Sequence, residues 1–154
     1  MTMRYASIRD LDISNGEGIG VALFVQGCKF HCKNCFNQVT WDFQGGKEFT
    51  QQVREGFLKL IQRPFIQRVS ILGGEPLEDE NYRDVIDLLK TIDNVEKWVY
   101  TGYRKEELMY FGKHEVFKYA DVIVDGRYID ELRDLNLKFR GSSNQRILRK
   151  GVDF

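Results

Sequence analysis

The chain has 154 residues, of which 42% are hydrophobic and 13% aromatic, a composition that is typical of a globular protein and excludes a disordered one. Lysine plus arginine and aspartate plus glutamate number 23 each, so no global charge attracts nucleic acid or an anionic membrane. No apolar run approaches a membrane span, and the first residues lack the apolar core of a signal peptide. We therefore expect a single cytoplasmic domain over residues 1–154, with neither nucleic acid nor a membrane as partner.

The apolar pattern predicts alternating strands and helices. Residues 4–14 mix apolar and charged side chains and indicate an extended edge segment. Four short apolar runs are typical of strands buried on both faces: 21–25, 68–72, 97–101 and 121–125. Helical spacing or helix-favouring residues predict helices over three ranges: 53–61, 81–92 with Asn81 as its N-cap, and 104–119 as one broken helix or two short ones.

A glycine-rich stretch precedes the first of these strands: Asn15-Gly16-Glu17-Gly18-Ile19-Gly20. Such a run can cradle phosphate, but a dinucleotide fingerprint follows a buried strand and opens a helix. Here a strand follows instead. We interpret residues 15–20, the glycine-rich loop, as a flexible connection.

Alternation of strands and helices predicts a parallel sheet built from right-handed βαβ units. Each predicted strand is followed by a glycine, so four glycine-bearing loops should meet at one edge: Gly27, Gly73, Gly102 and Gly126. A closed eight-stranded barrel takes about 250 residues, and this chain can supply roughly half of one. The expected fold class is therefore α/β, an incomplete (β/α) barrel of partial TIM type. We expect a macromolecular partner or a second copy of the chain to cover its open side.

All three cysteines lie between Gly27 and Cys35, a segment that we call the cysteine loop. Cys28, Cys32 and Cys35 have the spacing C-x3-C-x2-C, and three thiolates suit zinc or an iron–sulfur cluster. Three cysteines on a 4Fe–4S cluster keep one iron open to a non-protein ligand, whereas a closed zinc site needs a fourth protein ligand. His31 is the nearby candidate. Because it is adjacent to Cys32, both side chains would have to reach the same ion from neighbouring backbone positions, so we interpret His31 as a loop-tip residue. The spacing favours the cluster.

A second motif, Gly73-Gly74-Glu75-Pro76, stands at the carboxyl end of the next strand. Glycines let the backbone approach a ligand closely, Glu75 can accept hydrogen bonds from an ammonium group, and Pro76 stiffens the turn. By itself such a string is equally typical of an ordinary turn. Because parallel strands end at the same edge, we expect it to lie beside the cysteine loop.

The two motifs together resemble the radical S-adenosylmethionine superfamily. In that family three cysteines hold a 4Fe–4S cluster, the fourth iron chelates the amino and carboxylate groups of S-adenosylmethionine, and the glycine-rich turn holds the methionine ammonium. Other stretches resemble one branch, the activating enzymes of anaerobic ribonucleoside-triphosphate reductases: Asn15-Gly16, 23–28, Cys35-Phe36-Asn37, Thr40-Trp41, 100–103, 121–126 and 140–145. The resemblance runs from about Asn15 to Arg146.

This resemblance implies an oxidoreductase. Reductive cleavage of S-adenosylmethionine at the cluster would yield a 5′-deoxyadenosyl radical, which generates a glycyl radical on the large subunit of the reductase. The implied metal ligands, catalytic through the cluster, are Cys28, Cys32 and Cys35. The implied cofactor-binding residues are Asn34, Phe36, Gly73, Gly74, Glu75, Pro76, Thr101 and Asp125. For Thr101 and Asp125, helix capping is the alternative. The implied partners are the reductase and a small flavodoxin-like electron donor, with 139–154 as a partner-docking tail and a homodimer as a further assembly.

The chain departs from the relatives' pattern at a few positions. Glu17 and Gly20 replace a proline and an arginine, Asn34 replaces an aromatic residue or glycine, and Glu75 replaces the aspartate frequent in this branch. Two alternatives stay open. One is a short radical S-adenosylmethionine enzyme that acts on a small molecule, such as a deazaguanine precursor. The other is a non-catalytic zinc-binding interaction module held by the three cysteines and His31.

Overall fold

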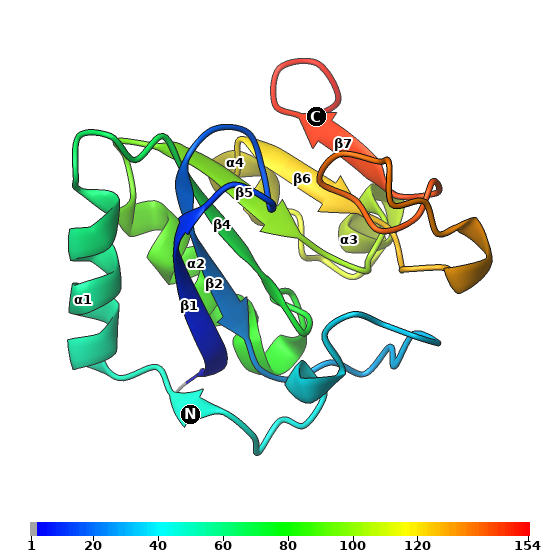
Figure 1. Ribbon diagram of the computed structural model, residues 1–154, viewed down its shortest axis with the longest axis horizontal. Coiled ribbons are helices and arrows are strands. Elements are labelled where there is room, and N and C mark those ends of the chain that lie inside the picture. The colour runs from blue at the N-terminus through cyan, green and yellow to red at the C-terminus, as the bar shows by residue number, and fades with distance from the viewer. Residues whose placement is uncertain (1–2) are drawn as a thin grey trace.

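The computed structural model describes residues 3–154 as one mixed sheet flanked by helices (Figure 1). The strands are β1 Arg4–Asp12, β2 Gly20–Val25, β3 Lys47–Glu48, β4 Arg68–Gly73, β5 Glu96–Tyr100, β6 Val122–Asp125 and β7 Arg146–Arg149. The α-helices are α1 Gln51–Ile61, α2 Asp79–Thr91, α3 Lys105–Tyr110 and α4 Val116–Tyr119, and two 3₁₀ turns are η1 Gln38–Thr40 and η2 Asp130–Leu132. Within residues 3–154, none of the helices is long and apolar enough to cross a membrane.

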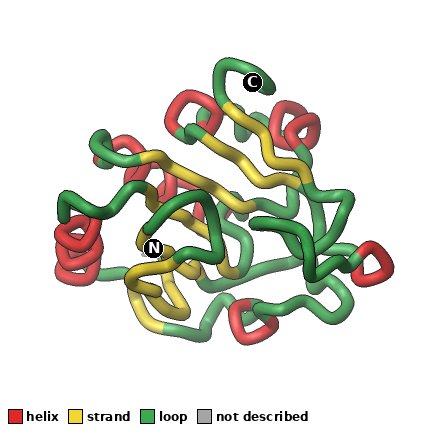
Figure 2. Tube along the Cα trace, turned by 45° about the horizontal axis from the view of Figure 1, so that its top comes forward, coloured by secondary structure: helices red, strands yellow, loops and turns green. Residues whose placement is uncertain are grey.

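The sheet has the order β3-β1-β2-β4-β5-β6-β7. Its central four strands, β2, β4, β5 and β6, run parallel, whereas β1 and β3 on one side and β7 on the other pair antiparallel with their neighbours. The two outer strands do not pair with each other, so the sheet is open (Figure 2). The prediction of an α/β fold with four parallel strands is confirmed, and the antiparallel additions make the sheet mixed.

The edges differ from expectation. Residues 4–14 do form a strand, but β1 is not the outermost one, because the two-residue β3 pairs with it through Arg4 and Tyr5. The polar tail, whose conformation the sequence does not predict, contains β7, which pairs in register with β6 through Ile147 and Leu148. Two apolar residues among charges are too short a pattern to predict a strand.

The two faces of the sheet are covered in different ways. Alternate residues of the central strands, such as Leu23, Ile71 and Val99, join the main core with side chains from the helices. The opposite face has two smaller apolar clusters, around Phe24 with Leu72 and around Trp98 with Val124. Loops rather than helices lie over that face in Figure 1, chiefly the glycine-rich loop and the orange stretch after β6. A cavity on this face is therefore bordered by loops.

The prediction that Asn81 caps the second helix is wrong. Helix α2 begins at Asp79 with Glu78 as its N-cap, because two acidic residues in its first turn suit the positive end of the helix dipole. Asn81 is buried inside the first turn, where its amide donates to the carbonyls of Gln26 (3.1 Å) and Glu75 (3.0 Å). It thus joins α2 to the ends of β2 and β4. The charged segment after β5 forms two short helices, as one of the predicted alternatives has it.

Candidate metal centre and its cavity

A cavity of about 370 Å³ lies at the carboxyl ends of the central strands, on the face without helices. Eight of the predicted site residues line it: Cys28, Cys32, Cys35, Phe36, Gly73, Gly74, Glu75 and Thr101. The structure therefore brings both sequence motifs to one cavity. Three predicted site residues, Asn34, Pro76 and Asp125, are not part of its lining.

The two motifs are hydrogen-bonded to each other through their backbones. Gly74 N–H donates to the carbonyl of Val25 (3.0 Å), and Glu75 N–H donates to that of Gly27 (2.8 Å). This follows from the parallel pairing of β2 with β4, whose last residues are direct partners. Gly27 and Gly73 both have positive φ angles, 104° and 114°, which glycine adopts without strain. The chain can therefore turn sharply out of both strands at the same level.

All three thiols are free and partly buried. Burial raises the pKa of the Cys28 thiol to about 11, and the nearby Glu75 carboxylate acts in the same direction. Burial also raises the pKa of Cys32, with the neighbouring Cys35 as the next cause. A metal that takes thiolate ligands would displace these protons, so metal binding should release acid. Three soft sulfur donors on one cavity wall fit an iron–sulfur cluster.

His31 lies at the tip of the cysteine loop, at a φ of 47°. Its ring is stacked on the indole of Trp41, with a centroid distance of 4.4 Å and an interplanar angle of 6°. Trp41 also accepts the backbone hydrogen bond of Cys28 through its carbonyl oxygen (3.1 Å). The stacking gives His31 a packing role inside the loop, in keeping with the interpretation of a loop-tip residue.

Among residues 3–154, Glu75 is the one carboxylate that lines the cavity, and it is buried. Its oxygens accept hydrogen bonds from the Gly102 amide (2.6 Å), the Thr101 hydroxyl (2.7 Å) and the Leu77 amide (2.9 Å). Burial nevertheless dominates and raises its pKa to about 7. A cation bound beside Glu75 would favour the charged carboxylate, so this group is suited to an ammonium ligand.

The remaining wall is rich in positive charge. Arg9, Arg127 and Arg140 line the cavity, and Arg127 also lies over the Phe30 ring with a distance of 4.5 Å to its centroid. The Tyr100 hydroxyl is buried and has no hydrogen-bond partner within residues 3–154, and burial raises its pKa. One acid, several cations and an unused hydroxyl suit a ligand with both an ammonium group and oxygen-rich groups.

Asp125 and Asn34 have protein partners outside the cavity. Asp125 accepts hydrogen bonds from the Lys105 amide at the start of α3 (2.8 Å) and from Arg146 Nε (2.9 Å). These contacts match the capping alternative for Asp125. Arg146 also pairs with Glu106 (3.0 Å).

The Asn34 amide donates to the Asp130 carboxylate (2.8 Å), and Pro76 follows Glu75 in the turn. The cofactor roles predicted for Asn34, Pro76 and Asp125 remain predictions.

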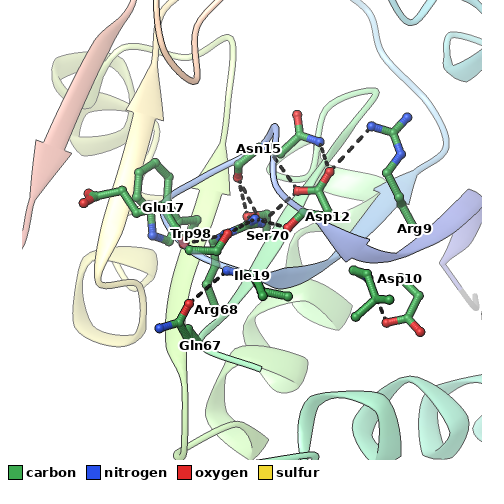
Figure 3. A network of polar contacts seen from close by, with 12 residues as sticks. Arg9, Asp10, Asp12, Asn15, Glu17, Ile19, Gln67, Arg68, Ser70 and Trp98 are labelled. Carbon is green, nitrogen blue, oxygen red and sulfur yellow. Dashed lines mark hydrogen bonds and ion pairs between the residues drawn. The ribbon is translucent and has the colours of Figure 1, made fainter. Parts of the chain in front are cut away.

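Sequence reasoning missed the network that holds the glycine-rich loop (Figure 3). Arg68 at the start of β4 is fully buried and pairs with Asp12 (3.0 Å) and with the Ser70 hydroxyl (2.7 Å). Its guanidinium also donates to the carbonyl of Asp12 at the end of β1 and to three loop carbonyls, those of Asn15, Glu17 and Gly18. Asn15 in turn lines the cavity. The loop is therefore packed around a buried cation. The interpretation of residues 15–20 as a flexible connection is corrected, because this guanidinium holds the loop in place.

Arg68 also explains the glycine at position 20. A Cβ atom there would lie 2.6 Å from the Arg68 carbonyl oxygen and 2.7 Å from its guanidinium carbon. Arg68 thus fills the space beside the strand into which a larger side chain at position 20 would extend. The one hint in the sequence was an arginine immediately before the apolar run 69–72.

Comparison with known proteins places the chain in a family. Residues 14–148 match the 4Fe-4S single cluster domain. The chain is 36% identical over 149 residues to the anaerobic ribonucleoside-triphosphate reductase-activating protein of Salmonella typhi, covering 93% of this chain and 96% of the relative. Proteins of the same name show 35% identity over 153 residues in Vibrio cholerae serotype O1 (96% and 98% covered) and 34% over 149 residues in Enterobacteria phage T4 (94% and 93% covered). These matches do not favour the zinc module or the small-molecule enzyme. The chain belongs to the family of anaerobic ribonucleoside-triphosphate reductase-activating proteins, with a 4Fe-4S single cluster domain.

Proposed function

We propose that this chain activates an anaerobic ribonucleoside-triphosphate reductase by radical chemistry on S-adenosylmethionine. The observation that carries the proposal is the joint cavity, in which the cysteine loop and the Gly73–Pro76 turn are hydrogen-bonded to each other beside a buried carboxylate. Family membership supports it, because the relatives are named for activation of that reductase.

Cys28, Cys32 and Cys35 would hold the cluster. When bound and reduced, the cluster would supply the electron for cleavage of a carbon–sulfur bond of S-adenosylmethionine, and the chemistry would end with transfer of a hydrogen atom from a glycine of the reductase to the released 5′-deoxyadenosyl group. Three cysteines supply one ligand fewer than the four irons of such a cluster, so S-adenosylmethionine would have a place to bind that no residue of the cysteine loop takes.

The chain's own residues bind and orient the ligand. The Glu75 carboxylate would accept the ammonium group, and the cation would in turn hold Glu75 ionised, against the effect of its burial. Gly73 and Gly74 keep the backbone close to that position, and Thr101 fixes the Glu75 carboxylate through its hydroxyl. Phe36 and the backbone of Asn34 would flank the adenine. Apolar lining by Phe24, Leu72 and Phe139 helps to exclude water, which protects a reactive radical.

The open sheet suggests where the partner enters. We interpret the fold as an incomplete (β/α) barrel whose inner face is the one without helices. The reductase's glycine segment would reach the cavity from the open side, between the glycine-rich loop and residues 139–146. A small flavodoxin-like protein would supply the electron, a second copy of the chain could complete a homodimer, and the reaction would take place in the cytoplasm.

The test begins with anaerobic reconstitution of the protein with iron and sulfide. After reduction and addition of S-adenosylmethionine, we expect 5′-deoxyadenosine, and with the reductase present a glycyl-radical electron paramagnetic resonance signal. Alanine at position 28, 32 or 35 should abolish the cluster, whereas His31→Ala, the matched control in the same loop, should keep it. Stoichiometric zinc without iron–sulfur absorbance would overturn the proposal, and loss of the cluster in His31→Ala would indicate a four-ligand site.

A further inference from the structure

The outer side of the cysteine loop is tied to a distant segment by one side chain. Asn34 lies in the left-handed region at a φ of 57°, a conformation that asparagine tolerates better than most residues other than glycine. Its Nδ2 donates to Oδ2 of Asp130 at 2.8 Å, across 96 positions of the sequence. Asp130 is the first residue of η2. The amide of Asn34 therefore does more than allow the backbone turn.

The segment that carries Asp130 packs against the cysteine loop. The Tyr128 ring packs on Phe36 with 5.0 Å between centroids, and the Tyr128 hydroxyl donates to Asp130 (2.9 Å). The backbone of Tyr128 acts to lower the pKa of the Cys32 thiol, against the effect of burial. Between these contacts, the Asn34–Asp130 bond closes the span from Cys32 to Cys35. One side of the metal-ligating loop is thus shaped by residues 128–130.

A second contact of this region, the ion pair of Lys33 with Glu131, should be weaker than the Asn34–Asp130 bond. Lys33 and Glu131 pair at 3.5 Å, but their side chains are 73% and 68% exposed. Exposed ion pairs at such distances contribute little, because water screens them and both long side chains lose freedom. The Asn34 bond is also exposed, but it is shorter, orders only a short side chain, and has an ionised acceptor that the Tyr128 hydroxyl also holds in place.

We propose that Asn34 is a positioning residue, which through Asp130 holds the span from Cys32 to Cys35 in its ligand-ready shape. The inference rests on the proposed function, in that these cysteines hold the cluster. It gives the side chain of Asn34 a role of its own, beside any backbone contact with the ligand. Loss of the bond should let the loop open more often and release iron faster.

The experiment uses the reconstituted full chain and measures the rate at which an iron chelator removes the cluster under anaerobic conditions. Asn34→Gly keeps the backbone conformation and removes the bond, and Asp130→Ala removes its acceptor. We expect each to accelerate iron loss about threefold to tenfold, as the loss of one ordinary, solvent-exposed hydrogen bond implies. The double variant should lose iron no faster than either single variant, because both remove the same bond. The matched control, Glu131→Ala, removes the adjacent acid and should stay close to wild type.

Exchange of the two side chains provides a rescue. Asn34→Asp alone sets two carboxylates against each other and should release iron faster than Asn34→Gly. Adding Asp130→Asn restores a donor and an acceptor, and should return the rate and the electron paramagnetic resonance line shape of the reduced cluster toward wild type. Wild-type retention by Asn34→Gly would overturn the inference, and so would fully multiplicative effects of Asn34→Gly and Asp130→Ala.

Amide hydrogen exchange of residues 32–37 in the metal-free chain tests the same bond without the cluster. We expect faster exchange in Asn34→Gly and Asp130→Ala than in Glu131→Ala. If wild-type protein assembled no cluster, the proposed function would fail, while the exchange rates would still decide whether the bond shapes the loop. Equal exchange in all variants would count against the inference.

Discussion

The glycine-rich loop and the cysteine loop border the same cavity but are held by different kinds of contact. The glycine-rich loop surrounds the buried guanidinium of Arg68, which donates to several of its carbonyls. The cysteine loop is held at Gly27 by backbone bonds to Thr40 and Glu75, while its outer side chains, such as Lys29 and Asn34, make exposed contacts. One loop is therefore held by a buried charged side chain, whereas the side-chain contacts on the outer side of the other are exposed.

The difference follows from what each loop must satisfy. A buried arginine is tolerated only when its charge is paired and its N–H groups have acceptors, so Arg68 and the loop carbonyls require one another. Partly buried thiols are weak hydrogen-bonding groups, and a metal can replace their protons. The stability of the metal-free chain should therefore depend strongly on the first loop and weakly on the second.

The largest expected effect is that of Arg68→Met. It removes the buried cation of Asp12 and leaves that carboxylate only the longer pair with the exposed Arg9 (3.6 Å), which should lower the free energy of unfolding of the metal-free chain by about 3–5 kcal/mol. Urea unfolding measures this change. Arg63→Met is the matched control, because Arg63 pairs with the half-exposed Asp10 and should cost less than about 1 kcal/mol. Similar losses in both variants would contradict the comparison.

Glu75 lines the cavity that the two loops border, and its effect on stability should depend on pH. Because burial raises its pKa from 4.5 to about 7, the folded state binds the proton more tightly than the unfolded state. The resulting stabilisation is fully present below pH 4.5 and is lost as the pH rises through about 7, by at most about 3 kcal/mol. Glu75→Gln should remove this dependence. The unfolding free energies of wild type and variant are measured at pH 5 and at pH 8. An equal change between the two pH values in both proteins would refute the assignment of this pH dependence to Glu75.

The smallest expected effect on stability is that of Cys28→Ala. Removal of one partly buried sulfur should change the unfolding free energy of the metal-free chain by no more than about 1 kcal/mol. The same variant should take up no cluster after reconstitution, as iron content and visible absorbance would report. A loss of unfolding free energy close to that of Arg68→Met would mean that the cysteine loop contributes as much to folding stability as the contacts of Arg68.

The parts of the fold that local patterns determine could be predicted from the sequence. The continuous apolar runs before Gly27, Gly73 and Gly126 correspond to β2, β4 and β6, because strands buried on both faces need apolar residues at every position. The adjacency of the cysteine loop and the Gly73–Pro76 turn followed from the parallel order of their strands. Helix α1 could be predicted because its apolar spacing agrees with its Thr50 cap.

Other features depend on partners that are distant in sequence. Asn81 has the chemistry of a cap, but inside α2 it donates to carbonyls of Gln26 and Glu75. Asp125 stands at a strand end that faces the cavity edge, yet Arg146 and the start of α3 take its carboxylate. No local pattern identifies these contacts, since in each case the deciding partner comes from another element.

By itself, the sequence determined the donor set of the candidate site and the level of the sheet at which it stands, because cysteine spacing and strand ends are local properties. Only the tertiary structure decided how the two bordering loops are held. Arg68 is buried because Asp12 and the loop carbonyls, some 50 positions earlier, surround it, and Asn34 is tied to Asp130, 96 positions later. Such pairings depend on which segments the folded sheet brings together. The partner of a single charged or amide residue therefore cannot be inferred from the local sequence.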